Sequence, residues 1–112
     1  MNIVISAQEP ELDGPIDVRF GRAPYFILLD LESGKWEACA NPAVSQSGGA
    51  GVAAAQFVID RKAEVAISGD FGPNANRALK AAGVKMYTFT ADTSSVRYAF
   101  DLYKQGGLPQ FD

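Results

Sequence analysis

Two arginines and two glycine-rich turns are the features of this sequence that could do chemistry. Arg19 and Arg22 flank Gly21 immediately before an apolar stretch. Guanidinium groups are permanently charged and form paired hydrogen bonds with carboxylates, phosphates and other anions. This first candidate site therefore favours binding of an anion. In the alternative interpretation, the arginines pair with the acidic loop that precedes them and bind nothing.

The second candidate is a run of glycines, Gly48, Gly49 and Gly51, where a helix is expected to begin. Backbone N–H groups at the start of a helix are unpaired, and the helix dipole favours a negative charge there. The run also fits the dinucleotide pattern G-x-G-x-x-A, with Asp70 about 20 residues further on, where a ribose-binding acid would lie. That pattern should follow a strand directly, and residues 41–47 intervene. A bare anion-binding helix start or a plain loop fits better.

The third candidate is the turn that contains Gly69, Asp70 and Gly72 and leads to Asn74. A strand is expected to end here and a helix to begin. Ligands of open α/β sheets tend to bind outside the carboxyl ends of the strands, so this turn is expected at the mouth of a site. Alternatively, Asp70 serves only as a turn or capping residue.

Metal-ligating residues are scarce. The chain has no histidine and one cysteine, Cys39, so it cannot build a standard zinc or iron–sulfur site within one chain. The absence of histidine also removes the commonest general base. We therefore expect a binding module rather than an enzyme. No metal site is expected within one chain, and the alternative that Cys39 serves as a bridging ligand between two chains stays open.

Length and composition limit the classes of protein that fit. The chain has 112 residues, 47% of them hydrophobic, which suits a single domain over 1–112. Ten basic and 13 acidic residues leave a net charge of -3, which argues against nucleic acid as a partner. No apolar run is long enough to span a membrane, and no signal peptide is evident. The expectation is a cytoplasmic protein, a monomer or weak dimer, with residues 107–112 as a tail.

The elements that must position these loops follow from apolar periodicity. The pattern predicts strands over 2–7, 25–31, 35–39, 64–68 and 84–89, and helices over 51–62, 73–82 and 93–105. A turn at Gly34 makes the second and third strands a hairpin, and the later β-α-β units require parallel pairing with right-handed crossovers. This predicts an α/β fold in the order β-β-β-α-β-α-β-α, a mixed five-stranded sheet with helices on both faces. Asp92, Thr93 or Ser94 is expected to cap the last helix.

In this order, the loops resemble the dinitrogenase iron-molybdenum cofactor biosynthesis family. The matching stretches cover residues 17–26, 41–42, 48–51, 68–74, 78–79 and 82–84. The resemblance implies a ribonuclease-H-like fold and a non-catalytic binding or carrier domain for an anionic cluster of the iron-molybdenum or iron–sulfur type, or for a small anion. It also implies a protein partner in metallocluster assembly. In the family's cofactor carriers a histidine commonly precedes the Phe-Gly pair, and Arg19 stands at that position here.

Two other classes of function fit parts of the sequence. A ribonuclease-H-like fold can host a metal-dependent nuclease, which needs clustered carboxylates. The first predicted strand carries none, and Asp30 and Asp70 lie on different strands. A protein-interaction or regulatory module would instead use Trp36 or the aromatic C-terminal helix.

Overall fold

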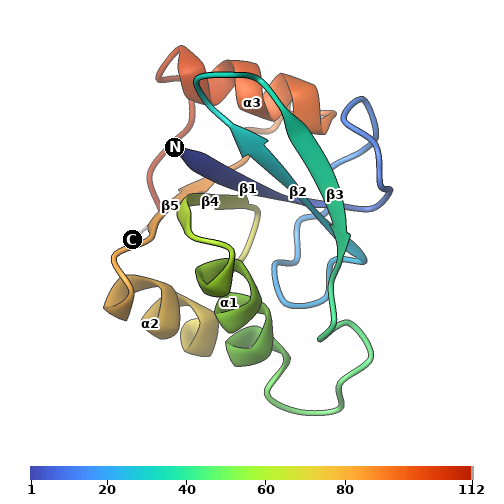
Figure 1. The fold of residues 1–112 in the computed structure, drawn as a ribbon, viewed down its shortest axis with the longest axis vertical. Coiled ribbons are helices and arrows are strands. Elements are labelled where there is room, and N and C mark those ends of the chain that lie inside the picture. The colour runs from blue at the N-terminus through green and yellow to red at the C-terminus, as the bar shows by residue number, and fades with distance from the viewer. Residues whose placement is uncertain (112) are drawn as a thin grey trace.

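A mixed five-stranded sheet with helices on both faces forms the fold of residues 1–111, which the computed structural model describes (Figure 1). The elements are β1 (Asn2–Ala7), β2 (Tyr25–Asp30), β3 (Trp36–Ala40), α1 (Ala50–Asp60), β4 (Ala63–Ser68), α2 (Pro73–Ala81), β5 (Lys85–Thr88) and α3 (Val96–Lys104). The predicted element order and the α/β class are confirmed. The bounds of each element differ from the expected ones by only a few residues at either end.

The strands follow the order β3-β2-β1-β4-β5 across the sheet. β1 pairs with β2, and β2 with β3, in antiparallel fashion, whereas β1 with β4 and β4 with β5 are parallel. The hairpin and the parallel β-α-β units are therefore where the sequence predicts them. Because β1 and β4 are parallel neighbours, the loops that follow them leave the sheet at the same end of the strands.

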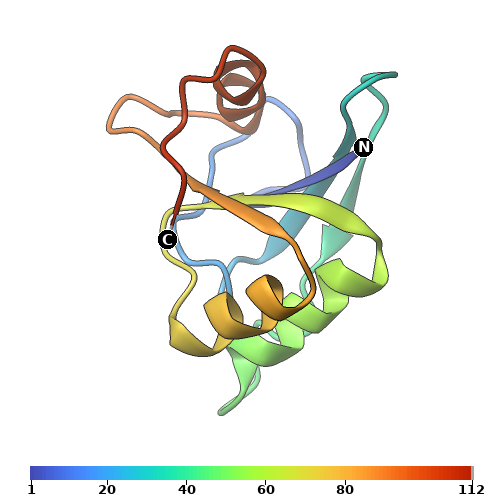
Figure 2. The same ribbon diagram turned by 90° about the vertical axis from the view of Figure 1, so that its left-hand side faces the viewer.

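The sheet separates two hydrophobic cores. α1 and α2 cover one face and α3 covers the other (Figure 2). Along β1, Ile3 and Ile5 face α3 while Val4 faces α1 and α2, as the alternation of side chains along a strand requires. The central strand is thus apolar on both faces, which explains its continuous β-branched run.

The cap of α3 is Ser95, so the prediction of Asp92, Thr93 or Ser94 is wrong. The Ser95 hydroxyl accepts a hydrogen bond from the Tyr98 N–H at 3.1 Å. Thr93 is unavailable because its Oγ1 accepts the N–H of Thr90 within a tight turn. Because of this turn, the helix begins at Val96, later than predicted. Local composition does not show which of the consecutive hydroxyl residues caps it.

Replacing Ser95 with alanine is expected to lower the free energy of unfolding by about 1 kcal/mol, because the Tyr98 N–H loses its acceptor. Urea denaturation measures this difference. The control is Ser94→Ala, which removes an exposed hydroxyl and should leave the unfolding free energy nearly unchanged. Equal losses in the two variants would contradict the assignment of the cap.

The C-terminal segment packs against β5 and is not the free tail that the sequence suggests. The Phe111 N–H donates to Met86 O at 2.8 Å, the Thr88 N–H donates to Pro109 O at 2.9 Å, and Leu108 is buried. Without this segment, β5 would be an open edge of the sheet. A stretch this short, with one proline, Pro109, and no periodicity, carries no strand signal of its own. Residue 112 lies outside the described residues.

None of the three helices within residues 1–111 has the length and apolar character needed to cross a bilayer.

Candidate functional site

The first and third candidate loops lie side by side at the carboxyl ends of β1 and β4. The Phe20 N–H donates to Asp70 O at 3.0 Å, and the Asp70 N–H donates to Val18 O. Arg19 and Asp70 form a parallel bridge that extends the sheet by one residue pair. Two segments about 50 residues apart in the sequence are therefore held in fixed register.

Two buried serines at the ends of β1 and β4 hold the first loop in place through hydrogen bonds. The Ser6 hydroxyl, at the end of β1, donates to Asp17 O at 2.6 Å and lies 2.7 Å from the Ser68 hydroxyl at the end of β4. Both serines are almost completely buried. Their hydrogen bonds satisfy polar groups that would otherwise be costly to bury, and they fix the first loop onto the sheet.

A pocket of about 300 Å³ opens where these loops meet the starts of α1 and α2. Eight of the ten predicted binding residues line it: Arg19, Gly21, Arg22, Gly49, Gly51, Asp70, Gly72 and Asn74. Its apolar part comes from Phe20, Ala50, Phe71, Pro73 and Ala75. The structure thus brings all three candidate loops to one place, at the edge of the sheet where the sequence predicts a ligand.

The two remaining glycines do not line the pocket. Gly48 lies in open space, where a Cβ atom would meet nothing within 4 Å. Gly69 packs against the first loop, and a Cβ atom there would lie 2.7 Å from the Cβ of Val18. Gly69 is therefore required for the close approach of the two loops, and its role is structural.

The helix starts at the pocket have free backbone donors. Neither α1 nor α2 has a side-chain cap, and neither carries an acid in its first turn. Among residues 1–111, the N–H groups of Ala50, Gly51, Asn74 and Ala75 have no hydrogen-bond partner. All four residues line the pocket, so two positive helix ends converge on it.

The start of α3 offers a direct contrast within the same chain. Its first-turn N–H groups donate to Gly14 O, Leu12 O and the Ser95 hydroxyl. Every donor at that helix end is therefore satisfied by the protein itself. The free donors of α1 and α2 are a property of the pocket and not of helix starts in this fold.

Backbone conformation at the pocket requires glycine. Gly72 has φ 76° and ψ 161°, a region that residues with a Cβ atom avoid. Gly21 lies so close to α1 that a Cβ atom would be 3.2 Å from the Cα of Gly51. These glycines let the two loops approach both helix starts closely.

Gly72→Ala is expected to lower the free energy of unfolding by roughly 1–3 kcal/mol because alanine is strained at this φ and ψ. A Cβ atom at Gly72 would clash with nothing, so the cost arises from the backbone. Denaturant titration measures it, and Gly48→Ala provides the unstrained control. A Gly72→Ala variant as stable as the wild type would show that this turn adopts another conformation in solution.

The two arginines differ in their partners. The Arg19 guanidinium lies 3.3 Å from a carboxylate oxygen of Asp17, which is 3% exposed. Arg19 therefore fits the alternative in which the acidic loop neutralises it. The Arg22 guanidinium instead donates to the carbonyl oxygens of Val44 and Gln46 and has no carboxylate partner in the described part of the chain. Its charge is therefore not held in an ion pair, although the Asp70 carboxylate lines the same pocket.

Asp70 serves partly as the turn residue of the alternative interpretation. One of its carboxylate oxygens accepts the Gly72 N–H at 3.2 Å, which stabilises the turn into α2. The dinucleotide pattern has no support, because β3 ends at Ala40 and a loop separates it from α1. A dinucleotide turn would follow its strand directly.

Asn41 supports the pocket and is absent from the predicted site residues. Its buried side-chain amide donates to Gly21 O and Ala23 O at 3.2 and 2.9 Å, and its oxygen accepts the Ala43 N–H. It thus ties the arginine loop to the segment after β3. The one signal in the sequence is the Asn-Pro pair, which indicates a turn but not these distant partners.

Carboxylates and thiols do not assemble into a metal site among residues 1–111. Asp30 pairs with Asn2 at the amino end of β1, whereas Asp70 follows the carboxyl end of β4. The two acids of the nuclease hypothesis therefore lie at opposite ends of the strands. Cys39 lies in β3 and does not line the pocket.

The fold and the pocket together define a small α/β domain with free amide donors and an unpaired arginine around one concave site. A family model described as dinitrogenase iron-molybdenum cofactor matches residues 1–106. The chain belongs to this family, which confirms the resemblance seen in the ordered loops.

Solved structures similar to this chain share its fold over nearly the whole length. The apo form of the orange protein from Desulfovibrio gigas is 37% identical, with a TM-score of 0.90 over 98% of this chain and 92% of that one. An NMR structure of a putative NifB protein from Thermotoga is 33% identical, with a TM-score of 0.84 over 97% and 91%. Comparison of sequences also finds a relative, an uncharacterized protein from Methanocaldococcus jannaschii, which is 27% identical over 83% of this chain and 80% of its own length.

Proposed function

We propose that this protein is a non-catalytic binder or carrier of an anion, either a small oxyanion or an anionic metallocluster of the iron-molybdenum or iron–sulfur type. One observation carries the proposal: the free N–H groups of two helix starts converge on the pocket that the unpaired Arg22 lines. Backbone donors and a guanidinium group are the standard means by which proteins hold negative charge. Membership of a family named for the iron-molybdenum cofactor supports the cluster as cargo.

The donors at the pocket fit an anion that arrives already assembled. Arginine and backbone N–H groups bind oxygen or sulfur atoms at the surface of such a ligand and supply no lone pairs to a bare metal ion. Arg19 stands at the position of the carriers' histidine, but its ion pair with Asp17 leaves Arg22 as the arginine that this mode of binding uses. The protein would thus hold its cargo by charge and hydrogen bonds, which permits release without breaking metal–protein bonds.

The size and lining of the pocket agree with a compact ligand. A volume of about 300 Å³ lies at the lower end of the range for small-molecule sites. Phe20 and Phe71, whose rings lie 5.2 Å apart, form an apolar floor that strengthens the charged interactions above it. A compact anion fits this site better than an extended nucleotide.

The remaining parts of the proposal follow from the family. The strand order and crossovers agree with a ribonuclease-H-like fold. We further propose a cytoplasmic location, a protein partner in metallocluster assembly, and no catalytic activity of the domain itself.

Titration with molybdate and with phosphate, followed by calorimetry and thermal unfolding, tests the proposed function. Binding to the folded state should raise the unfolding temperature, and the rise should grow with the logarithm of ligand concentration once that concentration exceeds the dissociation constant. Anaerobic reconstitution with iron, sulfide and molybdate, followed by visible absorption and metal analysis, tests the cluster separately. If neither anion nor cluster binds above the level of a protein with Arg22 replaced, the proposed function is wrong.

A further inference from the structure

The two edges of the sheet are treated differently. The edge strand β5 is covered by residues 107–111, through the Tyr87–Gln110 bridge and the neighbouring backbone hydrogen bonds. Within residues 1–111, no segment covers the opposite edge strand, β3, in this way (Figure 1). Open edges promote pairing with another chain, and proteins usually block them. The β3 edge is therefore a candidate surface for backbone pairing.

The hydrogen bonds at the two ends of β3 reveal which of its residues face outward. The Asp30 N–H donates to Lys35 O, and the Asn41 N–H donates to Pro24 O. Lys35 and Asn41 therefore face β2. Because backbone groups of alternate residues point to opposite sides of a strand, the even-numbered residues of β3 face outward. Their backbone groups have no backbone partner within residues 1–111.

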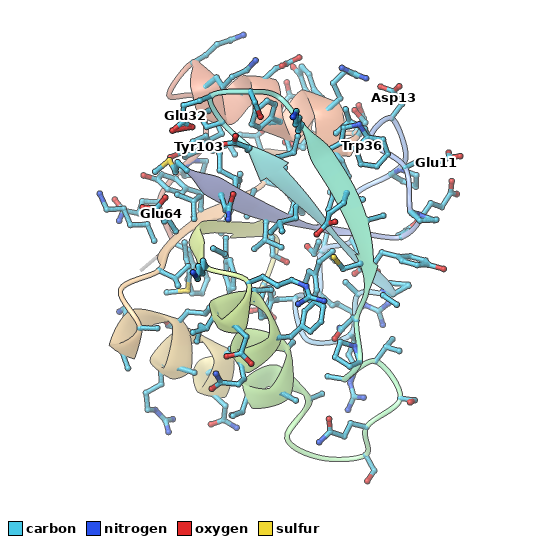
Figure 3. All side chains as sticks on the ribbon, viewed as in Figure 1. Glu11, Asp13, Glu32, Trp36, Glu64 and Tyr103 are labelled. Carbon is cyan, nitrogen blue, oxygen red and sulfur yellow. The ribbon has the colours of Figure 1, made fainter. Side chains whose placement is uncertain are left out.

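β3 lacks the two residue types that most often block an edge, proline and lysine. Its one charged residue is Glu37. Four of its five residues are exposed, including Ala38 and Ala40, whose small side chains leave the backbone accessible. Trp36 at the start of the strand is 43% exposed (Figure 3). The edge combines free backbone groups with an exposed aromatic side chain.

We propose that two copies of this chain pair through β3 in antiparallel fashion, with Ala38 of each copy on the two-fold axis. In this register, Trp36 lies opposite Ala40 of the second copy, so all three outward residues meet outward residues. A register centred on Cys39 would place Trp36 opposite Pro42, which has no N–H to donate. A register centred on Glu37 would place Ala40 opposite the turn residue Gly34. The Ala38 register makes the most hydrogen bonds.

Side-chain sizes favour a second copy over an unrelated peptide. On the face that carries Trp36, the indole of one copy lies over Ala38 and Ala40 of the other, whose methyl groups leave room for it. An aromatic residue beside small cross-strand neighbours covers apolar area without a clash. The strand is therefore complementary to itself under two-fold symmetry, as an isologous interface requires.

The opposite face limits the strength of the pair. Glu37 lies opposite Cys39 of the second copy, and the two Glu37 side chains become diagonal neighbours at about 7–8 Å. Like charges at this distance repel each other. Since one short strand also buries a small area, the dimer forms only at high protein concentration.

Ala38→Pro tests the pairing without altering the sheet's internal hydrogen bonds. Proline removes an N–H that faces solvent in the monomer, and edge strands tolerate it. Sedimentation equilibrium of the wild type should show a concentration-dependent dimer, Ala38→Pro should remain monomeric, and the control Ala38→Thr should still dimerise. A wild type that stays monomeric at every concentration, or a dimer that persists in Ala38→Pro, would overturn the proposal.

Glu37→Gln provides a test that misfolding cannot mimic, because it should strengthen the dimer. Removal of the diagonal repulsion should lower the dimer dissociation constant about threefold at low salt, with a smaller effect at high salt. A short bismaleimide should also link the single Cys39 of each copy, since the two lie on the same face as diagonal neighbours. An unchanged dissociation constant together with no Cys39 cross-link would mean that the copies pair through another surface, and would overturn the proposal.

Discussion

Replacing Arg22 with alanine is expected to weaken molybdate or phosphate binding at the pocket by roughly 10- to 100-fold, the usual range for a lost charged hydrogen bond. Arg22 lines the pocket and has no carboxylate partner in the part of the chain that the structure describes. Its charge is therefore not taken up by an ion pair, although one guanidinium nitrogen already donates to Val44 O and Gln46 O. Isothermal titration calorimetry at low ionic strength measures the change in affinity.

The matched control is Arg61→Ala. Arg61 lies at the other end of α1, with its guanidinium 4.1 Å from the centre of the Phe57 ring, so this variant loses the same net charge away from the pocket. Its anion affinity should stay close to that of the wild type. Equal affinities in Arg22→Ala and Arg61→Ala would mean that the anion does not bind at this pocket.

Arg22 also holds the loop after β3 through Val44 O and Gln46 O, so loss of binding could reflect a displaced loop. Arg22→Lys separates the two effects, because lysine retains the charge but not the forked hydrogen bonds. Partial recovery of affinity in Arg22→Lys would assign the effect to charge. Arg19→Ala is a poorer probe, since it would leave the buried Asp17 carboxylate unpaired, which is costly in itself.

Gly69→Ala is expected to lower the free energy of unfolding by about 3 kcal/mol, as overpacking of a rigid contact does. A Cβ atom there would lie 2.7 Å from the Val18 Cβ and 2.8 Å from the Val18 carbonyl oxygen. Backbone cannot move aside as a flexible side chain can. The two loops would separate, and the hydrogen bond from Asp70 N–H to Val18 O would be strained. Urea denaturation followed by circular dichroism measures the loss.

Gly48→Ala is the control, because a Cβ atom at that position has no neighbour within 4 Å and no positive φ applies. Its stability should match that of the wild type within about 0.5 kcal/mol. The pair compares two glycines of the candidate loops that sequence patterns cannot tell apart. A stable Gly69→Ala variant would contradict the close packing of the loops, and with it the shape of the pocket.

Much of the fold follows from local patterns in the sequence. The apolar run of Ile3, Val4 and Ile5 predicts a buried strand, and the helical spacing of Ala75 and Leu79 predicts α2, because burial of a face requires a matching period. The third candidate loop is predicted at the mouth of a site, since ligands of open α/β sheets bind outside the carboxyl ends of the strands. These inferences need only the chain order and the geometry of regular elements.

The sequence by itself thus determined the class of fold, the order of the elements and the end of the strands at which a ligand site was expected. Only the tertiary structure decided that Asp17 neutralises Arg19 while Arg22 stays unpaired, that Gly69 is structural, and that residues 107–111 cover β5. The physical reason is range: periodicity and turn preference act between near neighbours in the chain. Hydrogen-bond partners, close backbone approaches and edge pairing depend on atoms that only folding brings together.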